Sequence, residues 1–307
     1  MEYIKVSQAA EKWRLSPRRV RLLCAQNRID GVVQKGKLYM IPENAPKPVD
    51  ARTRKGIKVS KELSPLLLKI DALKAELDKK RPLTQGEAER LRDEFMVEFT
   101  YNSNAIEGNT LTLKETAMVL EGMTIDQKPL KDHLEAVGHR DAFLYIEDIA
   151  KDTKISETVI KNIHSLVLMN RPEDKGVFRK IPVTIMGAYT EPVQPYMIEP
   201  KMTELLTENE KRKKKMHPIE RIARFHLEFE GIHPFIDGNG RTGRLIINLE
   251  LMKAGYPPID IKFTDRMRYY DAFDHRSEMV KLFAEYLNKR LDQYLEVLGN
   301  PQTGSEG

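Results

Sequence analysis

Apolar residues recur every three to four positions along most of the chain after residue 63, the spacing that places them on one face of an α-helix. Ser64-Pro65 begins one such stretch, and the capping-box sequence Thr84-Gln-Gly-Glu87 begins another. The apolar stripe of the first stretch consists of Leu66, Ile70, Leu73 and Leu77. The pattern continues to about Leu298 and predicts a mostly α-helical body over residues 63–298.

The helical spacing is interrupted at residues 179–188, RKIPVTIMGA. Apolar and β-branched residues alternate in this run, which ends at Gly187, so the pattern predicts a short strand and with it a β-hairpin. An inert hairpin at the edge of the body is one interpretation of this segment.

Residues 1–45 follow a different pattern, with two short helices and then two strands. Ser7 can cap a first helix that runs to about Trp13, and Ser16-Pro17 can begin a second that runs to about Gln26. Residues 32–33 and 38–41 predict two strands joined by a Gln-Lys-Gly-Lys turn. On the second helix the apolar face holds Val20, Leu23 and Cys24, and the outward face holds Arg18, Arg19 and Arg21.

Charge divides the chain near the same place. Residues 1–61 contain 15 Lys and Arg against 5 Asp and Glu, whereas the remainder contains 36 against 41. A basic head on a mildly acidic body favours a polyanionic partner for the head. Residues 46–62, rich in proline and charge, predict a linker, and the small polar residues 299–307 predict a disordered tail.

Composition argues against a secreted protein and against a membrane-spanning protein. The N-terminus has no apolar signal core, and no stretch approaches the ~20 apolar residues that would span a bilayer. The single cysteine, Cys24, excludes a disulfide within the chain and a zinc-binding cysteine pair. We therefore expect a cytoplasmic protein.

Most of the candidate chemistry lies in residues 233–244, HPFIDGNGRTGR, directly ahead of an apolar helical stretch that Gly255 ends. Gly238 and Gly240 allow successive backbone N–H groups to curl around an anion at the positive end of that helix.

Four side chains of the same run complement such an anion site. Arg241 and Arg244 are three positions apart, so both can clamp phosphate oxygens. Asp237 offers a hard oxygen ligand for Mg²⁺ beside those phosphates. His233, with an ordinary pKa of ~6.5, suits a general base. The run therefore predicts transfer of a phosphoryl-type group to a hydroxyl.

These residues match the Fic-domain motif His-x-Phe-x-Asp/Glu-Gly-Asn-Gly-Arg-x-x-Arg at every fixed position, and the resemblance extends over roughly residues 90–290. Fic domains are all-helical, with a short β-hairpin flap. They transfer a nucleotide monophosphate, usually AMP from ATP with Mg²⁺, to a Ser, Thr or Tyr hydroxyl of a target protein. The resemblance implies that His233 deprotonates the hydroxyl, that Asp237 holds Mg²⁺, and that Arg241 and Arg244 bind the β- and γ-phosphates. It also implies an anion hole lined by Gly238, Asn239 and Gly240, with Thr242 and Gly243 among the nucleotide-binding residues.

A second run, Ser103-Asn-Ala-Ile-Glu107-Gly-Asn109, resembles the inhibitory helix of Fic proteins in its N-terminal arrangement, here near residues 98–108. This resemblance implies that Glu107 pairs with Arg244 and blocks seating of the γ-phosphate, with Ser103 supporting the helix. Taken alone, the run describes a helix that ends at Gly108 with Glu107 as a solvated carboxylate.

Other segments resemble Fic elements less specifically. The predicted hairpin resembles the flap that holds the target segment by strand addition. Its nucleotide-bordering residues would be Thr184, Ile185, Met186 and Gly187. Tyr269 and Tyr270 resemble a pair near the nucleobase, although two half-buried helix tyrosines would give the same pattern. The head, residues 1–45, resembles the winged helix-turn-helix of excisionase-like and MerR-like proteins, which implies duplex DNA binding. Protein docking is the alternative.

The reading that unites these features is a self-inhibited protein adenylyltransferase that modifies a target protein and itself, with a DNA-binding-type head. Two rivals stay open: removal of AMP, with Glu107 positioning water, and a nucleotide-sensing transcription regulator. The expected partners are ATP and a target protein, with a homo-oligomer as one alternative for the assembly of the chain.

Overall fold

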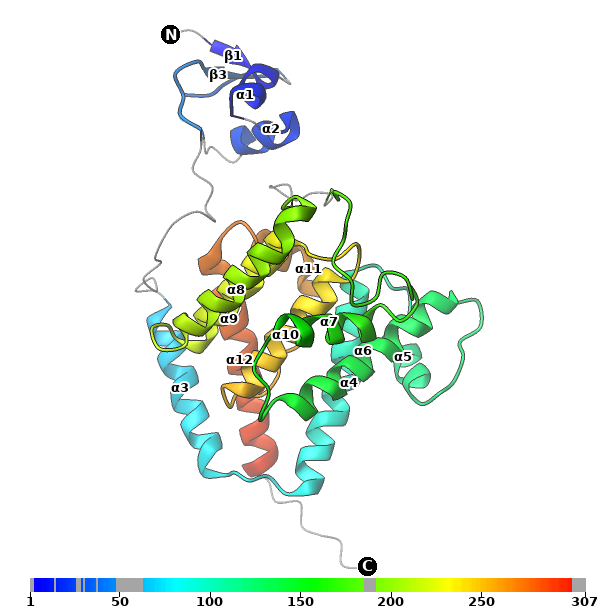
Figure 1. Cartoon of the computed structure of the whole chain (residues 1–307). Helices are drawn as coiled ribbons and strands as arrows, with labels where there is room; N and C mark the ends of the chain where they lie inside the picture. The colour runs from blue at the N-terminus through cyan, green and yellow to red at the C-terminus, as the bar shows by residue number, and fades with distance from the viewer. Residues whose placement is uncertain are drawn as a thin grey trace, which may run out of the picture. The chain divides into compact units, whose positions relative to one another are not determined.

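The computed structural model describes residues 3–13, 15–25, 29, 31–36, 38–47, 63–184 and 192–299. The chain divides into two compact units, Met1–Gly56 and Ile57–Gly307 (Figure 1). The predicted tail beyond residue 299 and most of the predicted linker lie outside the described residues.

The N-terminal unit is a pair of short helices with a small sheet. Its elements are β1 (Tyr3–Lys5), α1 (Val6–Trp13), α2 (Pro17–Ala25), β2 (Val33–Lys35) and β3 (Leu38–Pro42). The sheet is antiparallel with the order β1-β3-β2, in which Tyr3 lies opposite Pro42 and Val33 opposite Met40. Trp13, Val20 and Ile41 are buried at its centre. The two helices and the β2–β3 pair lie where the sequence places them.

Two details of this unit differ from the prediction. The sequence analysis missed β1, which is only three residues long. The prediction that Ser7 caps α1 is wrong, because α1 begins at Val6 and Ser7 lies inside its first turn. The Lys5 N–H, just ahead of the helix, instead donates to Gln8 Oε1 at 2.8 Å.

The larger unit is helical, as predicted. Its α-helices are α3 (Ser64–Lys79), α4 (Gln85–Ile106), α5 (Leu113–Leu120), α6 (Leu130–Ile149), α7 (Glu157–Val167), α8 (Ile198–Arg212), α9 (Pro218–Ile232), α10 (Asn239–Lys253), α11 (Arg266–Asp271) and α12 (Arg276–Gly299). Single 3₁₀ turns, η2 (Pro195–Met197) and η3 (Phe263–Asp265), precede α8 and α11. The predicted capping box begins α4, since Glu87 N–H donates to Thr84 Oγ1 at 3.3 Å and Thr84 N–H donates to Glu87 Oε2 at 2.8 Å.

Helix α10 lies at the centre of this unit, packed against α4, α6, α7 and α9. Twelve of its fifteen residues are buried. Its apolar residues contribute to two cores: Ile247 and Leu251 to the core shared with α3 and α12, and Leu245 and Leu249 to the core shared with α6 and α7. The polar first turn of α10 is therefore held rigidly by the packing of the rest of the helix.

The strand predicted over residues 179–188 is wrong for the described part, because residues 179–184 form no strand. Arg179 organises this segment instead. Its guanidinium donates to the main-chain carbonyls of Ile181, Val193 and His233, and its own N–H donates to Pro234 O. The segment folds around the Arg179 guanidinium. The alternation of apolar and β-branched residues therefore does not produce a hydrogen-bonded strand in residues 179–184. Residues 185–191 lie outside the described residues.

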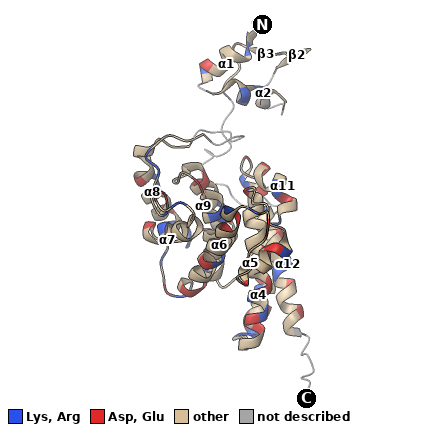
Figure 2. Ribbon diagram, turned by 90° about the vertical axis from the view of Figure 1, so that its right-hand side faces the viewer, with Lys and Arg blue, Asp and Glu red and all other residues tan. Residues whose placement is uncertain are grey.

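Charge is distributed differently in the two units. Figure 2 shows basic positions on α2, whereas α4 and α12 carry both acidic and basic residues. In the described part of the chain, no helix is both long and apolar enough to cross a membrane.

Candidate active site

The loop between α9 and α10 carries the motif, and its shape comes from two left-handed residues. His233 ends α9 with φ of 51° and ψ of 63°, an uncommon conformation for a residue with a side chain. Gly238 precedes α10 with φ of 73°, where a glycine carries no steric penalty. Asn239 closes the loop, since its side chain accepts from Phe235 N–H and donates to Phe235 O, both at 2.9 Å.

His164 on α7 supports this loop from behind. Its ring stacks on Phe235 with centroids 3.6 Å apart. Gly176 N–H donates to Nδ1 at 2.9 Å, which leaves the proton on Nε2, 3.0 Å from the carbonyl oxygen of Asp237. Burial lowers the pKa of His164 to about 4, so the ring is neutral at pH 7 and this hydrogen-bond pattern persists.

His233 lies at the mouth of the loop, with 19% of its side chain exposed. Burial, followed by the charge of Arg179, lowers its pKa to about 4, against weaker opposing effects of Glu107 and Asp237. The imidazole is therefore neutral near pH 7 and can accept a proton.

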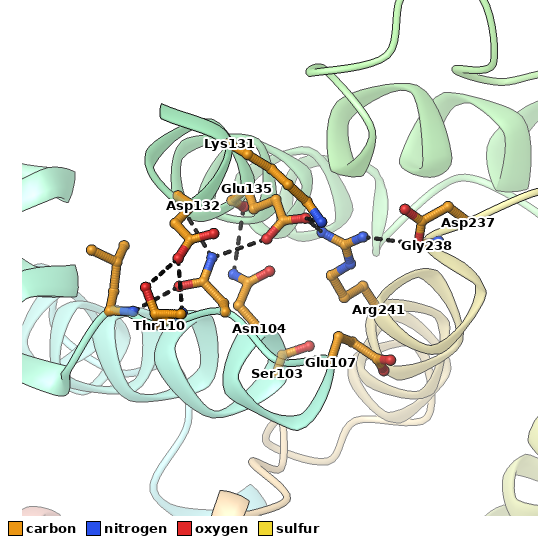
Figure 3. A network of polar contacts seen from close by, with 12 residues as sticks. Ser103, Asn104, Glu107, Thr110, Lys131, Asp132, Glu135, Asp237, Gly238 and Arg241 are labelled. Atoms are coloured by element: carbon orange, nitrogen blue, oxygen red, sulfur yellow. Dashed lines mark hydrogen bonds and ion pairs between the residues drawn. The ribbon is translucent and has the colours of Figure 1, made fainter. Parts of the chain in front are cut away.

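Asp237 and Arg241 form the first charged pair of the site. Gly238 N–H donates to Asp237 Oδ1 at 2.6 Å, and Arg241 Nη2 donates to the same oxygen at 3.3 Å. Burial opposes ionisation, yet Arg241 and the Gly238 N–H hold the pKa of Asp237 below its ordinary value. Arg241 itself is buried and also contacts Glu135 of α6, with Nη1 3.0 Å from Oε1 (Figure 3).

Arg244, one turn further along α10, faces the end of α4. Its Nε donates to Ser103 Oγ at 3.0 Å, and its Nη2 donates to Ser103 O and to Glu107 Oε1, each at 2.7 Å. Burial opposes the charged form, but Glu107 and neighbouring groups raise the pKa of Arg244 above its ordinary value. The structure thus brings Ser103, Glu107 and Arg244 together.

Glu107 also covers the first turn of α10. A Cβ added to Gly240 would lie 2.3 Å from Glu107 Oε1, which is shorter than real contacts allow. The glycine at 240 therefore permits the carboxylate to reach the positive end of the helix.

A further carboxyl group, that of Glu230 on α9, is buried behind this arrangement. Its Oε2 lies 3.8 Å from His233 Nδ1. Burial and then the charge of Glu107 raise its pKa to about 8, and Arg244 only partly offsets them. Glu230 is thus mostly protonated at neutral pH.

The other residues predicted to bind the nucleotide differ in burial and in their distance from the motif loop along the chain. Thr242 and Gly243 lie within the buried first turns of α10. Tyr269 is only 1% exposed and packs beneath Arg244 with its hydroxyl 2.7 Å from His226 Nε2, which fits the packed-tyrosine interpretation. Tyr270 is half-buried and donates to Ile106 O at 3.3 Å. Thr184 is exposed, and Ile185, Met186 and Gly187 lie outside the described residues.

The site offers a single carboxylate for a metal. Within the described ranges no group of three or more His, Cys, Asp or Glu side chains has metal-binding geometry. Asp237 is 38% exposed and receives its contacts on Oδ1. One carboxylate fits Mg²⁺ that takes its remaining ligands from phosphates and water.

Sequence reasoning missed His164 and Glu135. The sequence pattern gives no signal for His164, which supports the motif loop through Asp237 O and Phe235. Glu135 had a usable signal, since it is a carboxylate beside the apolar positions Ala136 and Phe143 of α6, where an acidic residue is rare unless paired.

Comparison with known proteins relates this chain to Fic proteins. Residues 154–251 match the model of the Fic/DOC family. The chain is 35% identical over 208 residues to protein adenylyltransferase Fic of Nematostella vectensis, covering 64% of this chain and 48% of that protein. The namesake in Drosophila melanogaster is 34% identical over 221 residues, covering 69% and 44%. This chain therefore spans about half the length of these relatives.

Solved structures give the same result for the fold. A Fic-domain-containing signaling protein from Bacteroides thetaiotaomicron superposes with a TM-score of 0.70 at 27% identity, covering 75% of this chain and 98% of that one. Fic-1 from C. elegans superposes with a TM-score of 0.67 at 28% identity, covering 77% and 72%. The helical unit of this protein has the fold of the Fic domain.

Proposed function

We propose that this chain is a self-inhibited protein adenylyltransferase, which transfers AMP from ATP to a Ser, Thr or Tyr hydroxyl of a target protein and of itself. The similar proteins named protein adenylyltransferase Fic support this assignment. Because the chain spans only part of their length, the residues of the site must carry the argument.

The observation that carries the proposal is the set of unused donors at the first turn of α10. Arg241 Nε and Thr242 Oγ are buried without a hydrogen-bond partner in the described part of the chain, and Arg241 Nη1 has only its ion pair with Glu135 at 3.0 Å. Buried donors are costly unless an acceptor satisfies them. The helix N-terminus adds positive potential at the same place, so a phosphate chain is the ligand that fits.

The chemistry would use this site as follows. The target oxygen attacks the α-phosphorus while its proton passes to the neutral His233 imidazole. The bond from the α-phosphorus to the bridging oxygen breaks, and diphosphate leaves. Charge that develops on the phosphate oxygens would meet the α10 N–H groups and Arg241, which are already oriented.

Asp237 would hold Mg²⁺ in this reaction. Its ionised, partly exposed carboxylate suits that role, and the ion would neutralise phosphate charge when bound.

Inhibition would come from Glu107. Arg244 cannot give its guanidinium fork both to Glu107 and to a γ-phosphate, since its geometry serves one bidentate partner at a time. The 2.7 Å contact with Glu107 therefore supports a closed resting state.

Incubation with α-labelled ATP, alone and with cell lysate, tests the proposal. Transfer predicts labelled protein from Glu107→Gly and none from the Glu107→Gly/His233→Ala pair. A nucleotide sensor would bind ATP and label nothing. An AMP-removing enzyme would instead release AMP from a premodified protein and lose that activity in Glu107→Gly.

For the N-terminal unit we propose binding of duplex DNA. The exposed Arg18 and Arg21 on α2 support this proposal, while the Arg19 side chain lies outside the described residues. The log of the affinity of the full chain should fall with log salt at about 0.9 per phosphate contact. Replacing Arg18, Arg19 and Arg21 with Ala should flatten that dependence. Absence of salt-dependent binding in the wild type would favour protein docking.

A further inference from the structure

Arg241 is fixed by a carboxylate that lies outside the motif. Glu135, in the second turn of α6, is 6% exposed in its side chain and faces the 2% exposed Arg241 at 3.0 Å. The contact crosses 106 positions of sequence, so it exists only because α6 packs on α10.

Glu135 is itself held from the opposite side. Asn109 Nδ2 donates to Glu135 Oε2 at 3.0 Å and to Asp132 O at 3.1 Å. Thr110 N–H donates to Asp132 Oδ2 at 2.9 Å, and Asn104 Nδ2 donates to Glu135 O at 3.4 Å. Figure 3 shows these side chains converging between α4 and α6, with Arg241 beyond Glu135. The carboxylate therefore has little freedom to move.

The pairing leaves Arg241 unsaturated. Only Nη2 makes a hydrogen bond, to Asp237 Oδ1, in the described part of the chain. Nη1 forms an ion pair with Glu135, and Nε has no hydrogen-bond partner among the described residues, so Nε and part of the Nη1 capacity stay available to a ligand. Glu135 thus balances the buried charge of Arg241 and leaves hydrogen-bond donors of Arg241 for a ligand.

Without Glu135, the charge of Arg241 would be balanced by Asp237 alone. The guanidinium would then move toward Asp237, since a buried cation takes the nearest carboxylate. The remaining N–H donors of Arg241 would then no longer point as they do beside the N-terminus of α10.

We propose that Glu135 is the positioning residue that keeps Arg241 directed toward the second phosphate of a bound nucleotide. This inference rests on the proposed nucleotide site and adds a determinant outside the motif. Glu135 touches no substrate and acts only through Arg241.

The experiment measures the affinities of ADP and AMP for the full chain by calorimetry in the presence of EDTA, so that no metal contributes. The wild type should bind ADP more tightly than AMP. Glu135→Gln should reduce the ADP-to-AMP affinity ratio about tenfold, as expected for loss of one oriented charge-assisted contact. AMP affinity should stay nearly constant, because AMP lacks the second phosphate.

A double-mutant cycle separates positioning from a merely structural role. Arg241→Ala should reduce the ratio by a similar factor, and Glu135→Gln should reduce it no further in that background. Lys131→Ala is the matched control, since Lys131 approaches the same Glu135 oxygen at 3.5 Å from an exposed position and should leave the ratio unchanged. Glu135→Asp, which keeps the charge but shortens the side chain, should give an intermediate ratio and serves if the Gln variant folds poorly.

The outcomes distinguish this inference from the proposed function. A wild type that binds neither nucleotide would overturn both. A wild type that prefers ADP, with the ratio unchanged in Glu135→Gln and Glu135→Asp, would overturn the positioning role alone. Independent losses in the double mutant would show that Glu135 does not act through Arg241.

Discussion

Arg241 and Arg244 lie three residues apart on α10, both are buried, and each faces a carboxylate from another helix. Glu135, the partner of Arg241, is 6% exposed and is held by Asn109 within a closed polar network. Glu107, the partner of Arg244, is 33% exposed and directly follows Ile106, the last residue of α4. One carboxylate is fixed by its surroundings, whereas the other can leave with a local change at a helix end.

Under the proposed function, this difference would give two similar ion pairs opposite consequences. A fixed partner orients an arginine for a ligand, because it persists when the ligand arrives. A displaceable partner competes with the ligand for the same guanidinium. Burial and tethering of the carboxylate, rather than the distance between charges, separate the two roles.

The largest expected effect comes from His233→Ala in the Glu107→Gly background, which removes the base from a protein that lacks the Glu107–Arg244 pair and keeps the Glu135–Arg241 pair. Loss of a general base typically costs ~10²–10⁴ in rate, while ATP affinity should hardly change because the imidazole acts on the hydroxyl. Label incorporation and calorimetry on the same preparations check both statements. Unchanged transfer would show that the base lies elsewhere.

Glu107→Gly should release Arg244 and raise transfer ~10- to 100-fold, the range expected from losing a charge-assisted contact of roughly 1.5–3 kcal/mol. Arg244→Ala should not imitate it, because that variant loses the phosphate ligand together with the contact. Initial rates of labelling compare the three proteins. If Glu135→Gln activated as strongly as Glu107→Gly, the distinction between the two pairs would fail.

The pH dependence of transfer should reveal the environment of His233. Its pKa is lowered to about 4, chiefly by burial and Arg179, so the neutral form persists as the pH falls from 7 to 5.5. An exposed histidine with a pKa of ~6.5 would lose about tenfold over that interval. Rates for Glu107→Gly, with folding checked at each pH, should stay nearly flat. A tenfold loss would contradict the burial of the base.

A smaller effect concerns Glu230, which lies 3.8 Å from His233 Nδ1 and interacts electrostatically with Glu107, Arg244 and Tyr269. Its pKa is raised to about 8, so its stabilising contribution is complete below pH 4.5 and is lost as the pH rises through 8. Glu230→Gln should therefore narrow the difference in Tm between pH 6 and pH 8.5, at roughly 2–4 °C per kcal/mol. Glu228→Gln on the same helix should not, and an unchanged difference in Glu230→Gln would exclude a protonated Glu230.

Local patterns predicted much of this molecule. The helices from Ser64 and Thr84 follow from apolar spacing and a capping box, both of which act within a few residues. The grouping of His233, Asp237 and Arg241 was predictable because a short glycine-containing loop must keep them close. The contact of Glu107 with Arg244 was expected only from resemblance to a family, since 137 positions separate them.

The features that the sequence pattern did not predict depend on packing between segments that are distant in sequence. From the sequence alone, Glu135 resembles a solvated acidic residue of a helix. Its role depends on the packing of α6 against α10, which brings it to Arg241. Residues 179–184 alternate like a strand, yet the buried Arg179 collects carbonyls from Ile181, Val193 and His233 and gives the segment another shape. In both cases one long polar side chain decides the outcome, and its partners are remote in sequence.

Intact-mass spectrometry of the full chain after incubation with ATP and Mg²⁺ tests the central claim most directly. The wild type, Glu107→Gly, Glu135→Gln and Glu107→Gly/His233→Ala are compared at equal times, with a lysate present in a parallel series. The account predicts added AMP on Glu107→Gly or on a lysate protein treated with it, much less with the wild type and Glu135→Gln, and none with the double variant. Equal AMP incorporation by the wild type and Glu107→Gly, or none by any of the four, would contradict it.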